Sequence, residues 1–197
     1  PMSAVTNECD RSVWLSLHWA HEPEQPEGRR ERRFRTGIQY ERWLLDDLRS
    51  AGCEVIEIDE TTGKQMAVEL AGGHLRGKLD GRVTGLPEAP KTEHVVECKS
   101  MKAADFRAVV KHGLAKAKPD HHAQCLLYMH ETGIKRCLYI CANKDTDEIH
   151  TERLEYDAGQ ALVIVARIER IVAAASMPNR ASDDPEAFVC RFCRAKP

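Results

Sequence analysis

A short strand that carries an acid and a lysine on one face is the feature that most constrains this fold. The segment 95–99, Val-Val-Glu-Cys-Lys, is apolar apart from Glu97 and Lys99. Side chains alternate between the two faces of a strand, so these two charges share one face. An unpaired buried charge is costly and is therefore usually partnered or neutralised. The segment 78–81, Lys-Leu-Asp-Gly, places Asp80 at the end of a neighbouring predicted strand, so two carboxylates and one ammonium converge.

Two interpretations fit this convergence. Carboxylate oxygens are the ligands that Mg²⁺ prefers, and magnesium sites keep positions open for water and a phosphate. Asp80, Glu97 and Lys99 are therefore candidates for a site that holds a metal ion against a phosphate. The alternative is a cross-strand salt bridge that only supports the sheet.

Length and charge narrow the class of protein. The chain has 197 residues, which predicts one domain or one domain with a small appendage, and 42% hydrophobic residues suffice for a core. A net charge of −2 gives no overall attraction to nucleic acid. The arginine-rich run 29–35 is a local basic cluster, either a solvated segment or a phosphate-contacting surface. No apolar segment is long enough to span a bilayer and no signal peptide is visible, so we expect a cytoplasmic protein.

Periodicity and breaker residues predict a mixed α/β fold with a sheet covered by helices. We expect a short helix at 12–20, a loop at 21–33 and a loop-like tail after 176. Further helices are expected at 34–50, 102–115, 121–131 and 158–176, and strands at 53–58, 65–70, 74–84, 94–99, 137–142 and 149–154. This pattern predicts an N-terminal segment (1–33), a core (34–176) and a C-terminal tail (177–197).

Glu41 interrupts an apolar stripe on the predicted helix 34–50. Phe34, Ile38, Leu45 and Leu48 follow a helical spacing, and Glu41 occupies the register where a leucine would be expected. A third acid beside Asp80 and Glu97 would suit a metal site. The alternative is a glutamate that extends to solvent from the edge of the stripe.

The predicted helix 121–131 carries a second polar pair. Gln124 and Tyr128 are four residues apart, so they lie on one helix face within an otherwise apolar run. An amide and a phenol there suit hydrogen bonds to a phosphate or a base edge, unless that face simply meets solvent. Lys111 is a further candidate for contact with nucleic acid, or an ordinary surface lysine.

Together these motifs resemble the PD-(D/E)xK nuclease superfamily, in particular its RecB-like exonuclease branch, which includes phage-type exonucleases and CRISPR-associated adaptation nucleases. The resemblance covers roughly residues 34–156. Members carry, in this order, a motif glutamate after a glycine, a metal-binding aspartate, a Glu-x-Lys pair and a Gln-x-x-x-Tyr helix. The matching residues here are Gly37, Glu41, Asp80, Glu97, Lys99, Gln124 and Tyr128. Leu79 stands where the family usually has a proline.

The resemblance implies a restriction-endonuclease-like core of order αβββαβ and a metal-dependent deoxyribonuclease, most simply an exonuclease acting on DNA ends. Asp80, Glu97, Glu41 and the Cys98 carbonyl would hold Mg²⁺ or Mn²⁺, and Lys99 would act on the water or the phosphate. The residues that it implies for DNA contact are Gln124, Tyr128 and Lys111. The alternatives are an end-trimming adaptation nuclease that works with recombination or CRISPR-type partners, and a non-catalytic DNA-binding subunit.

The cysteines carry a further resemblance. The chain has eight cysteines, and without a secretory signal a disulfide framework is not expected. Cys9 together with Cys190-x-x-Cys193 is similar to the iron–sulfur subset of the same branch, in which four cysteines hold a 4Fe–4S cluster that joins the chain ends. Only three cysteines fit here. The fourth would follow Cys193, or His18 or His21 would complete a zinc site instead. This resemblance implies a tail that packs near the N-terminal segment.

Overall fold

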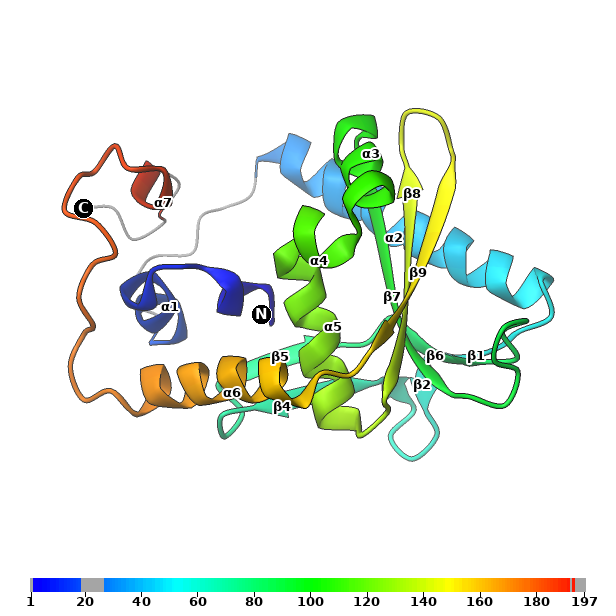
Figure 1. The fold of residues 1–197 in the computed structure, drawn as a ribbon, viewed down its shortest axis with the longest axis horizontal. Coiled ribbons are helices and arrows are strands. Elements are labelled where there is room, and N and C mark those ends of the chain that lie inside the picture. Colours follow the sequence, from blue (N-terminus) through cyan, green and yellow to red (C-terminus); the bar gives the residue numbers. More distant parts are fainter. Residues whose placement is uncertain (1, 19–26, 192, 194–197) are drawn as a thin grey trace.

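The computed structural model describes residues 2–18, 27–191 and 193 and is built on a five-stranded mixed sheet (Figure 1). The strands are β1 (Glu54–Ile56), β6 (Gly81–Thr84), β7 (His94–Met101), β8 (Arg136–Asn143) and β9 (Ile149–Glu155), in the order β1-β6-β7-β8-β9. β7 and β8 are parallel, and the other neighbouring strands are antiparallel.

Helices cover both faces of the sheet, as the sequence predicts. The C-terminal half of α2 (Gly28–Ser50) packs on one face, where Leu44, Leu45 and Leu48 meet Val96 and Cys98. The opposite face packs against α5 (Pro119–Thr132), with α3 (Ala103–His112), α4 (Leu114–Ala117) and α6 (Ala158–Ala173) beside it. The expected mixed α/β arrangement is therefore confirmed.

Three predicted strands are each divided in two. The segment 65–70 breaks at Met66, between β3 (Lys64–Gln65) and β4 (Ala67–Leu70). The segment 74–84 forms β5 (Leu75–Lys78), which pairs with β4 (Ala67–Leu70), and then β6 in the central sheet. Between them the Leu79 N–H donates to the Met66 carbonyl at 2.9 Å. The chain therefore leaves the two-stranded β4–β5 sheet before it enters the central sheet. The segment 53–58 breaks at Glu57 for a related reason, because the Glu57 carbonyl accepts from Met66 N–H and β2 (Ile58–Asp59) pairs with β3 (Lys64–Gln65).

α2 begins at Gly28, so the loop expected up to residue 33 is wrong over its described part; residues 19–26 lie outside the described part of the chain. Arginine and glutamate are good helix formers, and they extend the helix here although it has no core to pack on.

The apolar stripe predicted on this helix is longer than the stripe that the structure buries. Leu45 and Leu48 are buried, whereas Phe34 and Ile38 are 58% and 50% exposed, because this half of α2 lies beyond the sheet.

Smaller differences occur elsewhere in the helices. The predicted helix 102–115 is two helices, because Gly113 adopts a φ of +75° between α3 and α4. α1 (Asp10–Leu17) starts two residues earlier than expected, and α6 ends at Ala173. The tail contains one short helix, α7 (Phe188–Arg191), where a loop was expected.

The segment before α1 is part of the core. Met2 and Val5, in the 3₁₀ helix η1 (Met2–Thr6), are buried in the same cluster as Leu75 and Tyr128. Arg167 of α6 binds Asp10 and donates to the carbonyls of Val5 and Asn7, and the Trp14 indole donates to the Ala174 carbonyl at 3.1 Å. Residues 2–17 therefore share packing with the core, and α2 runs across the boundary predicted at residue 33, although the domain division itself stays a prediction.

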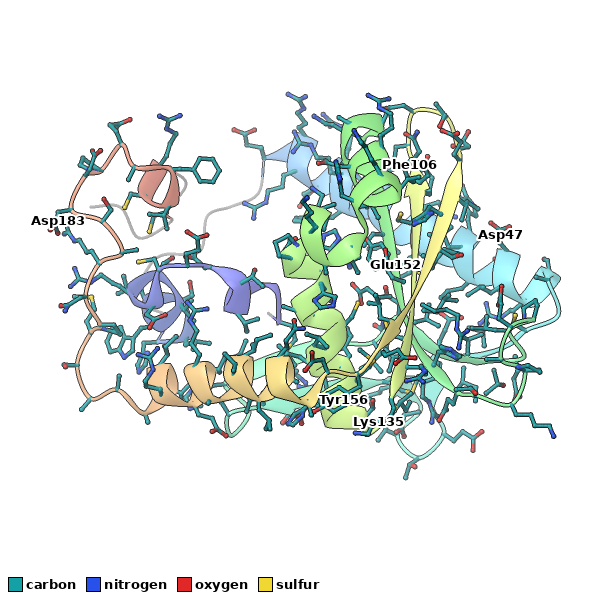
Figure 2. The ribbon with its side chains drawn as sticks, in the orientation of Figure 1. Asp47, Phe106, Lys135, Glu152, Tyr156 and Asp183 are labelled. Carbon is teal, nitrogen blue, oxygen red and sulfur yellow. The ribbon has the colours of Figure 1, made fainter. Side chains whose placement is uncertain are left out.

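A cluster at the start of β8 joins the second half of the chain. Figure 2 shows Lys135 and Tyr156 side by side, and the Lys135 ammonium lies 4.2 Å from the centre of the Tyr156 ring. The Tyr156 hydroxyl is 2.6 Å from His130 Nδ1 at the end of α5. α5, β8 and β9 therefore meet at one point beside the start of α6.

No helix in the described residues is long and apolar enough to cross a membrane.

Gly77 of β5 packs directly against η1 and α5, because it has no Cβ to separate them. A Cβ at Gly77 would lie 2.5 Å from Met2 Cγ and 2.6 Å from Tyr128 Cε1. We expect Gly77→Ala to lower the free energy of unfolding by about 1–3 kcal/mol through overpacking. Gly37→Ala is the matched control, because nothing lies within 4 Å of a Cβ there. In the middle of a helix that change should stabilise by about 0.5–1 kcal/mol. Urea unfolding measures both, and equal effects would contradict the close packing at Gly77.

Candidate active site

The site forms where β7 loses one of its neighbours. β6 pairs only with residues 94–96 of β7, whereas β8 pairs with residues 95–101. The edge of β7 that faces β6 is therefore open from Glu97 onward. Asp80 lies directly before β6, at this open edge. Because Gly81 pairs with Val96, the preceding Asp80 lies beside Glu97 of β7.

The turn that carries Asp80 is held by four hydrogen bonds. Asp80 Oδ2 accepts from the Cys98 N–H at 2.7 Å, in the place where a longer β6 would have bonded. Gln65 Nε2 donates to the Leu79 carbonyl at 3.0 Å, and the Tyr128 hydroxyl donates to the Lys78 carbonyl at 2.8 Å. The fourth bond is the one from Leu79 N–H to the Met66 carbonyl. The carboxylate is therefore positioned by its backbone as well as by its own contact.

Glu97 and Lys99 share one face of β7, opposite Val96 and Cys98, as the alternation predicts. They form an ion pair between Lys99 Nζ and Glu97 Oε1. Glu97 is fully buried, and its second oxygen, Oε2, has no hydrogen-bond partner among the described residues. A buried carboxylate oxygen without a partner is costly and indicates a missing ligand such as a cation or water.

Burial raises the pKa of all three acids, and Asp80 adds to the shifts of Glu97 and Glu41. Burial raises the pKa of Glu97 to about 7, with Lys99 opposing and Asp80 adding to the shift. Burial and the nearby Asp80 raise the pKa of Glu41 to about 7. Burial also raises the pKa of Asp80, although Lys99 and the Cys98 N–H favour its charged form. Burial opposes the charge on Lys99, but Glu97 and Asp80 more than compensate and raise its pKa, so it is an ammonium at neutral pH.

This donor set fits a hard divalent cation. Asp80, Glu97 and Glu41 provide carboxylate oxygens from three different elements, and crowded carboxylates with raised pKa values favour a bound positive charge. Among the described residues no three acidic, histidine or cysteine side chains already stand in a metal-binding arrangement. The chemistry of the three carboxylates suits such an ion, but their described arrangement does not form a ligand set, so the metal site stays a prediction.

The three residues predicted to contact DNA, Gln124, Tyr128 and Lys111, differ in how far they are buried. Tyr128 is 2% exposed, and its hydroxyl accepts from Gln124 Nε2 at 2.9 Å while donating to Lys78. This places Tyr128 as a support for the Asp80 turn, with Gln124 half-buried at the side nearer to solvent. Lys111 is exposed in the last turn of α3. Their roles toward DNA stay predictions.

His121 and Tyr139 also lie beside Glu97 and Lys99, which the sequence motifs do not indicate. Tyr139 lies opposite Glu97 in the β7–β8 register, and its hydroxyl is 2.8 Å from His121 Nδ1. Burial and the charge of Lys99 lower the pKa of His121 to about 4, so this imidazole is neutral at physiological pH. The available signal was spacing, because His121 precedes Gln124 by three residues and so lies on the same side of α5.

Cys193 of the tail lies beside α1, but the thiols of Cys9, Cys190 and Cys193 do not form a ligand set among the described residues. The Cys193 thiol is 3.8 Å from the Ser12 hydroxyl, close to Cys9 at the start of α1, whereas the Cys190 thiol contacts the Ser182 carbonyl. His18 stacks on Trp14, and His21 lies outside the described residues. The iron–sulfur or zinc site stays a prediction that this geometry does not support.

Solved structures resemble this fold, although no family model and no curated protein matches the sequence. The crystal structure of LHK-Exo in complex with dAMP superimposes with a TM-score of 0.61 at 16% identity, covering 87% of this chain and 83% of that chain. A second crystal structure of this alkaline exonuclease from Laribacter hongkongensis gives a TM-score of 0.57 at 17% identity with the same coverage. At these identities the likeness establishes the fold, which is restriction-endonuclease-like.

The raised pKa of Glu41 predicts a pH-dependent cost in the metal-free protein. A carboxyl whose pKa rises from 4.5 unfolded to about 7 folded destabilises the fold as pH rises through that window. We expect Glu41→Gln to raise the free energy of unfolding at pH 8 by about 1–2 kcal/mol, a value reduced for solvent screening, and to have no effect below pH 4.5.

Thermal unfolding in EDTA across pH measures this effect. Glu60→Gln in an exposed turn is the matched control and should leave the curve unchanged. Adding Mg²⁺ at pH 8 should raise the Tm of the wild type more than that of Glu41→Gln. A variant that is destabilised equally at pH 4 and pH 8 would show that Glu41 serves packing only.

Proposed function

We propose that this protein is a metal-dependent deoxyribonuclease that hydrolyses phosphodiester bonds at DNA ends. The observation that carries the proposal is the buried Glu97 at an open strand edge beside Asp80 and the charged Lys99. Its Oε2 has no partner within the part of the chain that the structure describes. A charged lysine and unpartnered carboxylate oxygen at one spot suit a phosphate and a cation together. The fold shared with an alkaline exonuclease supports the same reading.

In this proposal Asp80, Glu97 and Glu41 hold Mg²⁺ or Mn²⁺, with the Cys98 carbonyl as a further ligand. The ion, when bound, polarises the scissile phosphate and lowers the pKa of the attacking water. Lys99 stabilises the negative charge that develops on the phosphate, and its ion pair with Glu97 fixes where that positive charge lies. The Lys99 side chain is 26% exposed, so a phosphate can reach it from solvent.

The residues of α5 and α3 act around this centre. Tyr128 holds the Lys78 carbonyl and so keeps the Asp80 turn in place, while Gln124 orients the Tyr128 hydroxyl. Gln124 is half-buried beside the site and is available to contact the DNA strand. Lys111, exposed on α3, contributes to phosphate binding farther from the centre.

Loss of the charged groups should abolish cleavage. We expect Lys99→Ala and Glu97→Gln each to lower kcat by about 10²–10³ or more, because each removes a group aimed at charge in the transition state. The assay is a time course on end-labelled single- and double-stranded DNA with Mg²⁺, Mn²⁺ or EDTA. Lys91→Ala in an exposed loop is the control. Wild-type cleavage by Lys99→Ala would refute the assignment, and gel shift without cleavage by the wild type would favour a DNA-binding subunit.

Tyr128→Phe separates support of the turn from contact with DNA. The variant leaves the Lys78 carbonyl without its donor, which costs about 1–3 kcal/mol if no water replaces it. We expect kcat to fall while the Kd for DNA in EDTA stays unchanged, because the phenol is buried and positions Asp80. Gln124→Ala is the comparison variant and should raise Kd. A rise in Kd for Tyr128→Phe with unchanged kcat would instead mean that the phenol contacts DNA.

A further inference from the structure

The N-terminal half of α2 extends past the strands of the central sheet (Figure 1). Nearly every residue from Gly28 to Thr36 is exposed, whereas the helix becomes buried only from Leu44 onward. A helix that is polar all round and extends from the core gains little from packing, so its composition calls for another explanation. This half of the helix carries five arginines: Arg29, Arg30, Arg32, Arg33 and Arg35.

One face of this half-helix continues the face that carries Glu41. At 100° per residue, Gly37, Phe34 and Arg30 fall within about 40° of Glu41 around the helix axis. Phe34 is 58% exposed, and the Arg30 guanidinium lies over its ring at 5.7 Å from the ring centre. Nothing lies within 4 Å of where a Cβ would be at Gly37, which lies between Phe34 and Glu41 on this face. The face therefore carries an exposed aromatic ring in line with Glu41 along the helix.

The flanks of this face are positively charged. Among the described residues, no ion pair joins Arg29, Arg32, Arg33 or Arg35 to an acid, although arginines elsewhere in the fold are paired, as Arg167 is with Asp10. Glu31 is the single acid of this stretch. Four such arginines on a chain of net charge −2 suit a polyanion that binds locally.

The distance along the helix matches a short run of nucleotides. Phe34 precedes Glu41 by seven residues, which is about 10 Å at 1.5 Å per residue. A stacked strand rises about 3.4 Å per nucleotide, so Phe34 lies about three nucleotides from the phosphate at the site. An aromatic ring flanked by arginines is the combination that binds single strands, because bases stack on the ring and phosphates meet the charges.

We propose that Phe34, with Arg30 and Gly37 on the same face and the neighbouring arginines, forms a stacking platform for a base of single-stranded DNA entering or leaving the active site. The occupant is a single strand, because a ring on a helix surface can stack only on a base that is not paired inside a duplex. The inference rests on the proposed nuclease function and adds a subsite to it. A duplex that binds through phosphates alone is the competing occupant.

The first test measures binding of the whole protein without cleavage. Fluorescence anisotropy with a fluorescein-labelled oligo(dT) in EDTA should give a Kd about tenfold or more weaker for Phe34→Ala than for the wild type, as expected for loss of one stacked base. Phe34→Trp should keep wild-type affinity. Leu162→Ala is the matched control, since Leu162 is 55% exposed on α6. Equal affinities of Phe34→Ala and Leu162→Ala would overturn the proposal.

A second test locates the stacked base. Abasic spacers placed one at a time over the first six nucleotides should weaken wild-type binding most near the third position, and should add no loss there in Phe34→Ala. The salt dependence separates stacking from charge: Arg33→Ala should lower the slope of log K against log salt by about 0.7, and Phe34→Ala should leave it unchanged. Uniform spacer effects, or an equal loss of affinity for blunt duplex, would favour phosphate-only binding and overturn the platform.

Failure of the platform and failure of the proposed function give different results. If the wild type cleaves DNA, and Phe34→Ala binds and cleaves as well as Leu162→Ala, the nuclease proposal stands and the platform is refuted. A wild type that binds oligo(dT) through Phe34 but cuts no DNA with Mg²⁺ or Mn²⁺ supports the platform and removes the nuclease. A wild type that neither binds nor cuts removes both.

Discussion

The open edge of β7 is the constraint on which the rest of the structure depends. β6 covers only the first residues of β7, so the backbone from Glu97 onward needs a partner other than a strand. The Asp80 carboxylate takes that place by accepting the Cys98 N–H. The chain must therefore turn at Leu79 and Asp80, and Tyr128 and Gln65 are placed where they can hold that turn. The hydrogen bond that completes the edge of β7 therefore also positions the acid of the site.

The same geometry opposes stability. Asp80, Glu97 and Glu41 are brought close together with partial or full burial, and burial raises the pKa of each. Lys99 offsets part of this cost, but it pairs with only one oxygen of Glu97 and leaves the other without a partner among the described residues. Evolution retains such unfavourable burial chiefly at functional sites, where a ligand supplies the missing charge. In our proposal a bound cation supplies that charge, which a salt bridge that serves the sheet alone does not.

Much of the fold and of the candidate site was predictable because it depends on local patterns. The period of two placed Glu97 and Lys99 on one face, and helical spacing put Glu41 in register with the buried part of α2. The break between β5 and β6 was not predictable, because both halves have strand composition and the bonds that divide them come from distant residues such as Met66. The support given by Tyr128 was hidden for the same reason, since its partner is a backbone carbonyl fifty residues away.

α2 shows where a sequence pattern stops being informative about packing. Phe34 and Ile38 continue the stripe of Leu45, yet a stripe does not reveal where the sheet beneath it ends, and both are exposed. Folding alone does not account for an exposed phenylalanine among exposed arginines, because none of these side chains packs on the core. Since the helix is continuous, whatever binds Phe34 is held at a fixed distance from Glu41. In our proposal this rigid spacing couples recognition of the strand to the position of the phosphate at the metal.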